Sequence, residues 1–403
     1  MPKRNLGLSV FDAAKERISY CFDNYEKIII SFSGGKDSTV MTHLIMEEAI
    51  KRNRKVALLF IDWECQFSLT ISHIKNVYKL YANNIEPYWL SVPLTTDNAC
   101  SQIETTWTCW DQNKKDLWVR ELEDIMISDI KVFPFYYEGI TFEEFTPLFA
   151  KWYAKGSQTC NFMGLRADES LNRFRAVMGG KLNNNGVKYI TNIVDEVFAA
   201  YPIYDFQTRD IWIYNYKTKK PYNKLYDRMW QAGLSIHQMR IDEPFGDTTR
   251  RGLYLYQIIE PKMWAKLVAR VAGANVVNEY GRQRGNILGN QTISLPEGHT
   301  WKSFSNFLLD TMPKPTREHY KNKIAVYLQW FKVRSYPDGI PDEVPIEIQH
   351  KAPSWKMICK ALLKNDYWCR GLGFSITKSS NYQKYLDLMR RRRIAWTIYD
   401  ENL

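Results

Sequence analysis

The chain has 403 residues, of which 45% are hydrophobic and 25% are charged. This length favours two folded units, and this composition excludes both a small disulfide-stapled fold and a disordered chain. The net charge is +11, and residues 236–403 carry nearly all of it, with 26 Lys and Arg residues against 16 Asp and Glu residues. Such an excess favours a polyanionic partner such as DNA or RNA, the alternative being an ordinary basic surface in solvent.

Strand and helix patterns alternate over the first 235 residues. Short apolar runs predict buried strands at 26–33, 55–62 and 85–92, and the helical spacing of apolar residues predicts helices at 36–51 and 69–81. Fully apolar strands separated by amphipathic helices are typical of a parallel sheet that is covered on both faces. The sequence therefore predicts an α/β fold with a doubly wound parallel sheet.

An aromatic-rich segment interrupts this alternation at about 94–155. We interpret it as an insertion above the carboxyl edge of the sheet, with one helix at 117–127. The alternation then resumes with a strand at 159–165, a helix from Asp168 and a strand near 188–193.

Beyond residue 236 the pattern changes to longer helical segments, chiefly 253–272 and 318–334. We therefore predict two domains: an α/β domain at 1–235 and a basic, mainly helical domain at 236–403. Apolar runs are much shorter than the roughly 20 residues that cross a bilayer, and no apolar run follows the charged start, so we expect a cytoplasmic protein with no membrane partner.

The segment SFSGGKDST at 31–39, between a predicted strand and a predicted helix, has the composition of a phosphate-binding loop. Gly34 and Gly35 allow successive backbone N–H groups to converge on one anion, and the helix N-terminus directs partial positive charge to the same place. The side chains around them supply hydroxyl donors, a cation and a carboxylate that is suited to a metal ion: Ser33, Ser38, Lys36 and Asp37. The spacing excludes a Walker A loop and a GxGxxG turn, which leaves an ordinary Gly-Gly turn as the alternative.

SGGKDS resembles the pyrophosphatase loop of the adenine nucleotide alpha-hydrolase (PP-loop) superfamily, in its phosphoadenosine phosphosulfate (PAPS) reductase branch. Residues 164–173 (GLRADESLNR) resemble the G-x-R-x-x-E-S-x-x-R motif of that branch, and residues 201–212 (YPIYDFQTRDIW) resemble its P-I-x-D/W-x-x-x-D-I-W segment. The later segments MRIDEPFG and RGLYLYQIIEP are similar to a subgroup that contains the immunoglobulin-binding regulator A proteins.

The resemblance implies an ATP pyrophosphatase domain, which cleaves ATP between the α and β phosphates and leaves an adenylated substrate, as in sulfur transfer or nucleic-acid modification. It implies that the leaving phosphates are contacted by Ser33, Gly34, Gly35, Asp37 and Ser38, with Lys36 as their counter-charge. Mg²⁺ is the expected cofactor beside ATP, and Asp37 is its predicted ligand. The predicted catalytic residues are Lys36, Asp37 and Arg166.

Two arginines and two carboxylates complete the predicted nucleotide site. Arg166 follows a predicted strand, at the edge where open α/β sheets bind ligands, and Arg173 lies on the following helix, so both can bind phosphate. The alternatives are solvated helix charges or an ion pair with Glu169. Asp62 and Glu64 follow the second strand and are predicted to bind ribose hydroxyls or Mg²⁺, with a helix cap and an exposed acid as the alternative.

The seven cysteines argue against an ordinary PAPS reductase, whose nucleophile lies in a C-terminal E-C-G-x-H segment that this chain lacks. No CxxC pair is present, so an iron–sulfur or zinc site would need distant ligands such as Cys100, Cys109 and Cys160. The alternative is a set of buried, inert thiols in a reducing compartment.

A four-arginine cluster near the end of the chain is the strongest local signal for nucleic-acid backbone contact: Arg390, Arg391, Arg392 and Arg393. A basic helix C-terminus is the alternative. Two functions therefore remain open at this point. The first is an ATP-using enzyme that adenylates a substrate, and the second is a nucleotide-responsive regulator that acts on DNA or with a ParB-like partner, as the subgroup resemblance implies.

Overall fold

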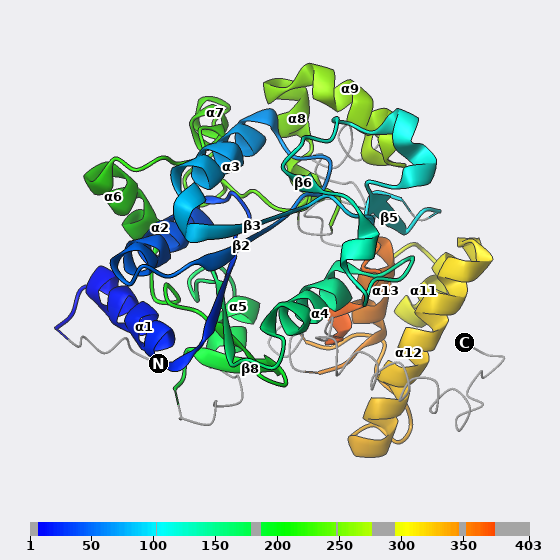
Figure 1. Ribbon diagram of the computed structural model, residues 1–403. Coiled ribbons are helices and arrows are strands. Elements are labelled where there is room, and N and C mark those ends of the chain that lie inside the picture. Colours follow the sequence, from blue (N-terminus) through cyan, green and yellow to red (C-terminus); the bar gives the residue numbers. More distant parts are fainter. Residues whose placement is uncertain are drawn as a thin grey trace.

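A seven-stranded sheet lies at the centre of the computed structural model, which describes residues 7–101, 103–178, 187–246, 249–275, 295–345 and 352–374 (Figure 1). The strand order is β6-β3-β2-β1-β7-β9-β8, and all neighbours are parallel except β8 and β9. The strands are β1 Lys27–Ser31, β2 Val56–Ile61, β3 Ile85–Leu90, β6 Met126–Ile127, β7 Thr159–Met163, β8 Ile190–Val194 and β9 Val197–Ala200. The predicted α/β fold is thus confirmed.

Alternate residues of the strands pack into two separate hydrophobic cores, one on each face of the sheet. Ile28 and Ile30 face one core and Ile29 faces the other, as the two-residue period of a strand requires. The first core contains apolar side chains of α1 Val10–Asn24, α2 Lys36–Lys51, α3 Ser68–Leu80 and α6 Thr208–Thr218. The second contains those of α4 Phe142–Ala154, α5 Leu171–Met178 and α7 Leu225–Gln231.

The insertion at 94–155 contains a hairpin of β4 Leu94–Asp97 and β5 Thr106–Cys109, followed by the 3₁₀ helix Gln112–Leu117. The helix predicted at 117–127 is wrong, because only β6 follows that 3₁₀ turn as a regular element before the 3₁₀ turn Ile130–Val132. Carboxylate and carbonyl oxygens of Glu64 accept hydrogen bonds from the Val119 backbone N–H and the Arg120 Nε–H at 3.2 and 2.9 Å. These tertiary contacts compete with the local helical preference and prevail.

The region after residue 236 is helical, as predicted, but its first helix is broken. The predicted segment 253–272 forms α8 Tyr254–Ile259 and α9 Pro261–Arg270, because Pro261 has no N–H to continue α8 and disfavours helical geometry at Glu260. Three further helices are α11 Trp301–Thr311, α12 Lys314–Arg334 and α13 Trp355–Leu363.

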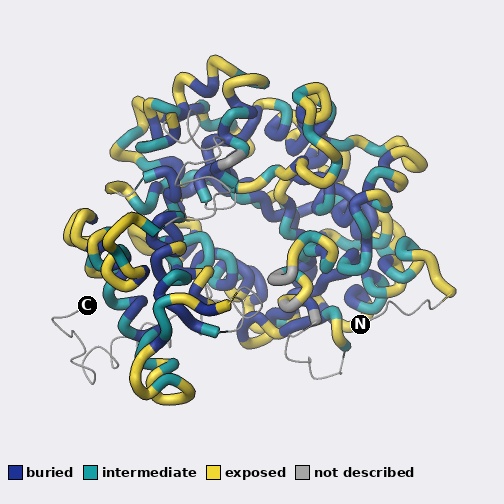
Figure 2. The backbone as a smooth tube through the Cα atoms, turned by 180° about the vertical axis from the view of Figure 1, so that it is seen from behind, coloured by how far each residue is buried: buried dark blue, intermediate teal, exposed yellow. Residues whose placement is uncertain are grey.

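The hydrophobic cores do not divide at the predicted boundary of 235/236. Buried side chains from Met239 to Ala274 belong to the second core of the sheet, whereas those from Trp301 to Leu372 form a third, separate core. Figures 1 and 2 show α12 at the outside of the molecule, with its far end exposed. The division at 235/236 stays a prediction, and the packing favours one between residues 274 and 301.

A buried ion pair joins the end of β2 to α9. Glu64 has no exposed surface, and both of its carboxylate oxygens accept hydrogen bonds from Arg270, at 2.9 and 3.0 Å. The backbone N–H groups of Trp110 and Val119 donate to the same carboxylate, at 2.7 and 3.2 Å. A fully hydrogen-bonded buried carboxylate tolerates its desolvation, but only as long as each partner is present.

Among the described residues, no helix combines the length and the apolar character that a membrane crossing requires.

We expect Arg270→Met to lower the free energy of unfolding by about 3–5 kcal/mol, because Glu64 is then left as a buried charge without its partner. Urea unfolding measures this, and the added substitution Glu64→Gln should restore part of the loss. Arg209→Met removes a guanidinium whose side chain is 74% exposed and is the matched control. A loss for Arg270→Met no larger than that of the control would contradict the account.

Candidate active site at the carboxyl edge of the sheet

The predicted phosphate loop lies between β1 and α2 and has the geometry that anion binding requires. Gly34 has φ of +71°, which favours glycine, and a Cβ there would lie 3.1 Å from side-chain atoms of Thr70 and Ile74. The hydroxyls of Ser33 and Ser38 lie 2.9 Å apart across the loop. Gly164, at the end of β7, packs against the first turn of α2, where a Cβ would lie 3.1 Å from Ser38 backbone atoms.

Three of the predicted catalytic residues meet at the N-terminus of α2. One Asp37 carboxylate oxygen accepts a hydrogen bond from Arg166 Nε at 2.6 Å, and the other lies 3.1 Å from Lys36 Nζ. Lys36 is 6% exposed, and burial lowers its pKa, an effect that Asp37 offsets. Because burial disfavours the charged form of the Lys36 amine, a phosphate bound nearby would stabilise that form.

Arg166 lies just after β7, at the carboxyl edge of the sheet as predicted, and its role as a phosphate clamp stays a prediction. It is 2% exposed, and besides Asp37 its guanidinium contacts the Phe206 carbonyl oxygen at 3.4 Å and the Thr208 hydroxyl at 3.3 Å. All three guanidinium nitrogens therefore point to protein atoms. Arg166 orients Asp37 and, through it, Lys36.

Arg173 and Arg240 extend the positive cluster beyond the loop. Arg173 forms an ion pair with Glu169, and Arg240 donates a hydrogen bond to the Glu169 carbonyl oxygen at 3.3 Å. Burial is the main cause of a lowered pKa of Arg173, and the nearby charge of Arg240 adds to it. Four cations from four segments of the chain thus gather near the N-terminus of α2.

Residues 239–243, which lie beyond the predicted domain boundary, form one wall of the site. We call this segment the strap. Lys36 Nζ donates a hydrogen bond to the Met239 carbonyl oxygen at 3.2 Å. Sequence analysis uses MRIDEPFG only for a resemblance, and it does not predict the contact with the loop because about 200 residues separate the two in the chain.

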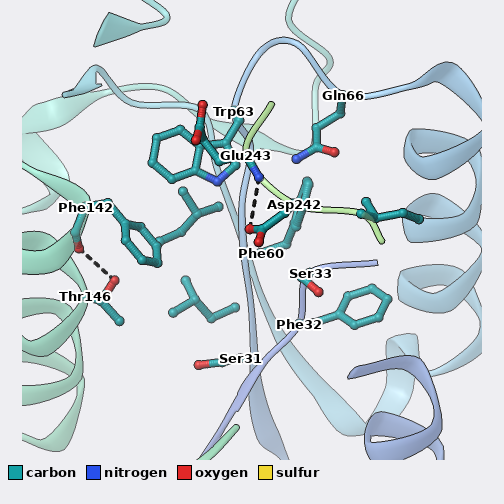
Figure 3. A pocket seen from close by; sticks show the side chains of 13 residues that line it. Ser31, Phe32, Ser33, Phe60, Trp63, Gln66, Phe142, Thr146, Asp242 and Glu243 are labelled. Carbon is teal, nitrogen blue, oxygen red and sulfur yellow. Dashed lines mark hydrogen bonds between the residues drawn. The ribbon is translucent and has the colours of Figure 1, made fainter. Parts of the chain in front are cut away.

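The strap closes a pocket at the carboxyl ends of β1 and β2, with a cavity volume of about 170 Å³ (Figure 3). The rings of Trp63 and Phe142 line it on one side, with centroids 5.3 Å apart, and Ser33 joins it to the phosphate loop. Five of the other lining side chains are apolar and five are polar, and the polar ones include Gln66, Asp242 and Glu243 (Figure 3). An apolar pocket with a few polar groups is typical of a small-molecule site.

Asp62 and Glu64 do not line this pocket. Both have no exposed surface. The Asp62 carboxylate forms an ion pair with Arg120 and accepts hydrogen bonds from the Trp89 indole N–H and the Glu64 backbone N–H, both at 2.9 Å. That Asp62 and Glu64 bind ribose or Mg²⁺ stays a prediction; in the structure both carboxylates are bonded to protein groups, and Trp63 between them lines the pocket. Their arginine partners come from the insertion and from α9, which no local spacing indicates.

Asp37 is the carboxylate of the loop and the candidate ligand for Mg²⁺. Both of its oxygens already contact cations. Mg²⁺ often binds one or two carboxylates together with substrate phosphates. A single carboxylate, that of Asp37, therefore fits an ion whose other ligands are mostly phosphate oxygens. Within the described ranges, no group of three or more His, Cys, Asp and Glu side chains is arranged as a metal site.

All seven cysteines are buried, which agrees with inert thiols. Burial raises the pKa of Cys100 to about 12 and that of Cys359 to about 11, so neither thiol is activated as a nucleophile. Cys160 lies in the core on the opposite face of the sheet from Cys100 and Cys109, so these three do not form one cluster. Arg390, Arg391, Arg392 and Arg393 lie outside the described residues.

Two family models together match most of the chain. The model described as the phosphoadenosine phosphosulfate reductase domain matches residues 27–232, about half of the chain. A second, described as a domain of unknown function (DUF3440), matches residues 233–337 and 333–383. The chain therefore belongs to the family of the phosphoadenosine phosphosulfate reductase domain, which confirms the predicted membership of the PP-loop superfamily. The narrower likeness to the immunoglobulin-binding regulator A proteins stays a prediction.

Individual proteins are similar to this chain over different extents. Uncharacterized protein YbdN of Escherichia coli (strain K12) is 41% identical over 402 residues, which cover 98% of both chains. Uncharacterized protein MJ0066 of Methanocaldococcus jannaschii is 25% identical over 53% of this chain and 37% of its own. The solved PAPS reductase of Candida auris is 14% identical over 53% of this chain and 83% of its own, with a TM-score of 0.31.

Two acids near the strap have perturbed pKa values. Burial raises the pKa of Glu243 from 4.5 to about 8 and that of Asp97 from 3.8 to about 7. A raised pKa means that the folded protein holds a proton that the unfolded chain releases. The folded state therefore loses stability as the pH rises from about 4.5, the ordinary pKa of Glu, to about 8, the pKa of Glu243 in the folded protein. Both groups act in the same direction.

We expect Glu243→Gln to reduce this pH dependence, because the amide has no proton to lose. Thermal unfolding at pH 5 and pH 8.5 measures it: the wild-type melting temperature should fall more between the two pH values than that of the variant. The exposed Glu16→Gln on α1 should behave as the wild type. Parallel pH profiles for Glu243→Gln and wild type would show that Glu243 does not titrate in this range.

Proposed function

We propose that this protein binds ATP at the carboxyl edge of the sheet and cleaves it between the α and β phosphates, so that AMP is transferred to an acceptor. The observation that carries the proposal is the loop 33–38, whose donors and buried Lys36 lie next to a pocket of the kind that holds a nucleoside. Membership of the PP-loop superfamily supports the same chemistry.

The β and γ phosphates bind, in this proposal, to the loop. Ser33, Gly34, Gly35, Lys36 and Ser38 supply backbone N–H groups, hydroxyls and a cation at the N-terminus of a 16-residue helix, which favours anions. Arg173 and Arg240 supply further positive charge, while Asp37 and Arg166 hold Lys36 in position. Asp37 and the phosphate oxygens would hold Mg²⁺, which would neutralise charge that develops at phosphorus.

The adenosine occupies, in this proposal, the pocket beside the loop. Trp63 and Phe142 offer aromatic surface to a purine, and Gln66 and Asp242 offer polar groups to its edge or to the ribose. This arrangement places the α phosphate near Ser33, where the pocket meets the loop. Asp62, which is buried against Arg120, takes no direct part.

The reaction forms one bond and breaks one bond at the α phosphorus. An oxygen of the acceptor attacks the α phosphorus, the bond to the α–β bridging oxygen breaks, and the electron pair leaves with pyrophosphate. The loop stabilises the charge that accumulates on the leaving group. The excess positive charge of residues 236–403 supports a nucleic acid as the acceptor. The same adenylated acceptor is also a suitable substrate for sulfur transfer.

The nucleotide-responsive regulator is the second candidate function, with DNA or a ParB-like protein as its partner. The same site would then bind ATP without turnover, so the two candidates differ in pyrophosphate release. The buried thiols with raised pKa values favour neither candidate and argue against sulfonucleotide reduction by a cysteine nucleophile.

We expect purified protein with Mg²⁺ and ATP to release pyrophosphate and AMP, and to do so faster with mixed RNA and DNA present. Lys36→Met and Asp37→Asn should each lower this rate about 100-fold, because the loop then stabilises the leaving group less well. The matched control is Lys51→Met, at the other end of α2, where the lysine side chain is 76% exposed. ATP binding by calorimetry without any pyrophosphate release would contradict adenylation and favour the regulator.

We also expect Arg240→Ala to raise the KM for ATP about tenfold, which is the effect of losing a hydrogen bond to a charged group. Steady-state kinetics measure the change, with the exposed Arg228→Ala of α7 as the control. If Arg240→Ala and Arg228→Ala have the same KM, the strap does not contribute to phosphate binding.

A further inference from the structure

The short segment before α7 is hydrogen-bonded directly to the phosphate loop. Asn223 has no exposed surface, and its amide nitrogen donates hydrogen bonds to the Gly34 carbonyl oxygen and the Thr70 hydroxyl, both at 3.0 Å. Three residues later, the Tyr226 hydroxyl accepts a hydrogen bond from the Lys36 backbone N–H at 2.8 Å. The loop is thus held from both sides by a segment about 190 residues away in the sequence.

The Tyr226 hydroxyl has a donor that no protein group among the described residues uses. A phenolic hydroxyl accepts hydrogen bonds at oxygen and donates one through its proton. Its oxygen accepts from Lys36, and no hydrogen bond within the described part of the chain takes up the proton. Tyr226 is 2% exposed, and a buried donor that stays unpaired costs free energy. A ligand acceptor is therefore expected where this proton points.

The surroundings of this hydroxyl identify the ligand as an anion. A Cβ at Gly35 would lie 3.5 Å from the Tyr226 oxygen, so the phenol lies against the glycine pair of the loop. Lys36 Nζ lies 5.6 Å from the centre of the Tyr226 ring. Trp212 packs edge-on against the ring at 5.6 Å and limits its rotation. Burial also raises the pKa of Tyr226, which keeps the phenol protonated as a donor.

We propose that the Tyr226 hydroxyl is a phosphate-binding group of this loop, which donates a hydrogen bond to the pyrophosphoryl part of the ligand while its oxygen fixes the Lys36 amide. This inference rests on the proposed function and adds a residue that neither the loop motif nor its spacing contains. It makes Tyr226 a determinant of selectivity for ligands with β and γ phosphates over AMP.

Tyr222→Phe is a matched control for Tyr226→Phe. Both tyrosines pack edge-on against Trp212, at 5.9 and 5.6 Å, but the Tyr222 hydroxyl donates to Asp227 at 2.9 Å and not to the loop. Each substitution removes one oxygen and keeps the ring. Thermal unfolding of both variants shows whether they remain folded.

Calorimetric titration with inorganic pyrophosphate and, separately, with AMP tests the proposal without any need for turnover. We expect Tyr226→Phe to weaken pyrophosphate binding about tenfold, as the loss of a hydrogen bond to a charged group predicts, and to leave AMP binding unchanged. Tyr222→Phe should bind both ligands as the wild type does.

The sign of the change separates a direct contact from a purely structural one. If the hydroxyl only occupies the Lys36 amide, its removal frees that amide for phosphate, and Tyr226→Phe binds pyrophosphate equally well or more tightly. That result would overturn this inference and leave the proposed function intact. Failure of the wild-type protein to bind either pyrophosphate or ATP would overturn both.

Discussion

The ion pair between Glu64 and Arg270 is the contact on which the assembly of the site depends. It joins the end of β2 to α9, and through the N–H groups of Trp110 and Val119 the same carboxylate also holds the insertion. Glu64 has φ of +64°, an unusual conformation for a residue with a side chain, so its carboxylate contacts stabilise a backbone that local preference disfavours. The desolvated charge makes the interaction specific, because neither partner tolerates the loss of the other.

One consequence is that the candidate active site is composite. The sheet supplies the loop and the floor of the pocket, Trp63 after β2 and Phe142 of α4 supply its aromatic side, and residues 239–243 close it. The positive charge at α2 is assembled in the same manner from separate segments. A nucleotide that bound there would contact both of the regions that the two family models match, 27–232 and 233–383. The hydrophobic core that the two regions share as far as Ala274 holds them together around this site.

The parts that the sequence predicted correctly depend on local chemistry. Nine consecutive residues at 31–39 contain the loop, and period-two burial defines the strands on either side. The parts that it missed depend on distant partners. The helix predicted at 117–127 gives way to hydrogen bonds with Glu64, and no local pattern indicates that Arg120 binds Asp62 or that Asp37 binds Arg166. The break at Pro261 could have been predicted, because proline disfavours helix continuation at that position.

In the proposed function, the loop binds the β and γ phosphates while the adenosine lies in the adjoining pocket. A crystal structure with Mg²⁺ and an ATP analogue in which methylene replaces the α–β bridging oxygen tests this directly. The account predicts the β and γ phosphates on residues 33–38, with the purine in the pocket lined by Trp63 and Phe142. A nucleotide bound elsewhere, or one whose phosphates point away from Lys36, would contradict it.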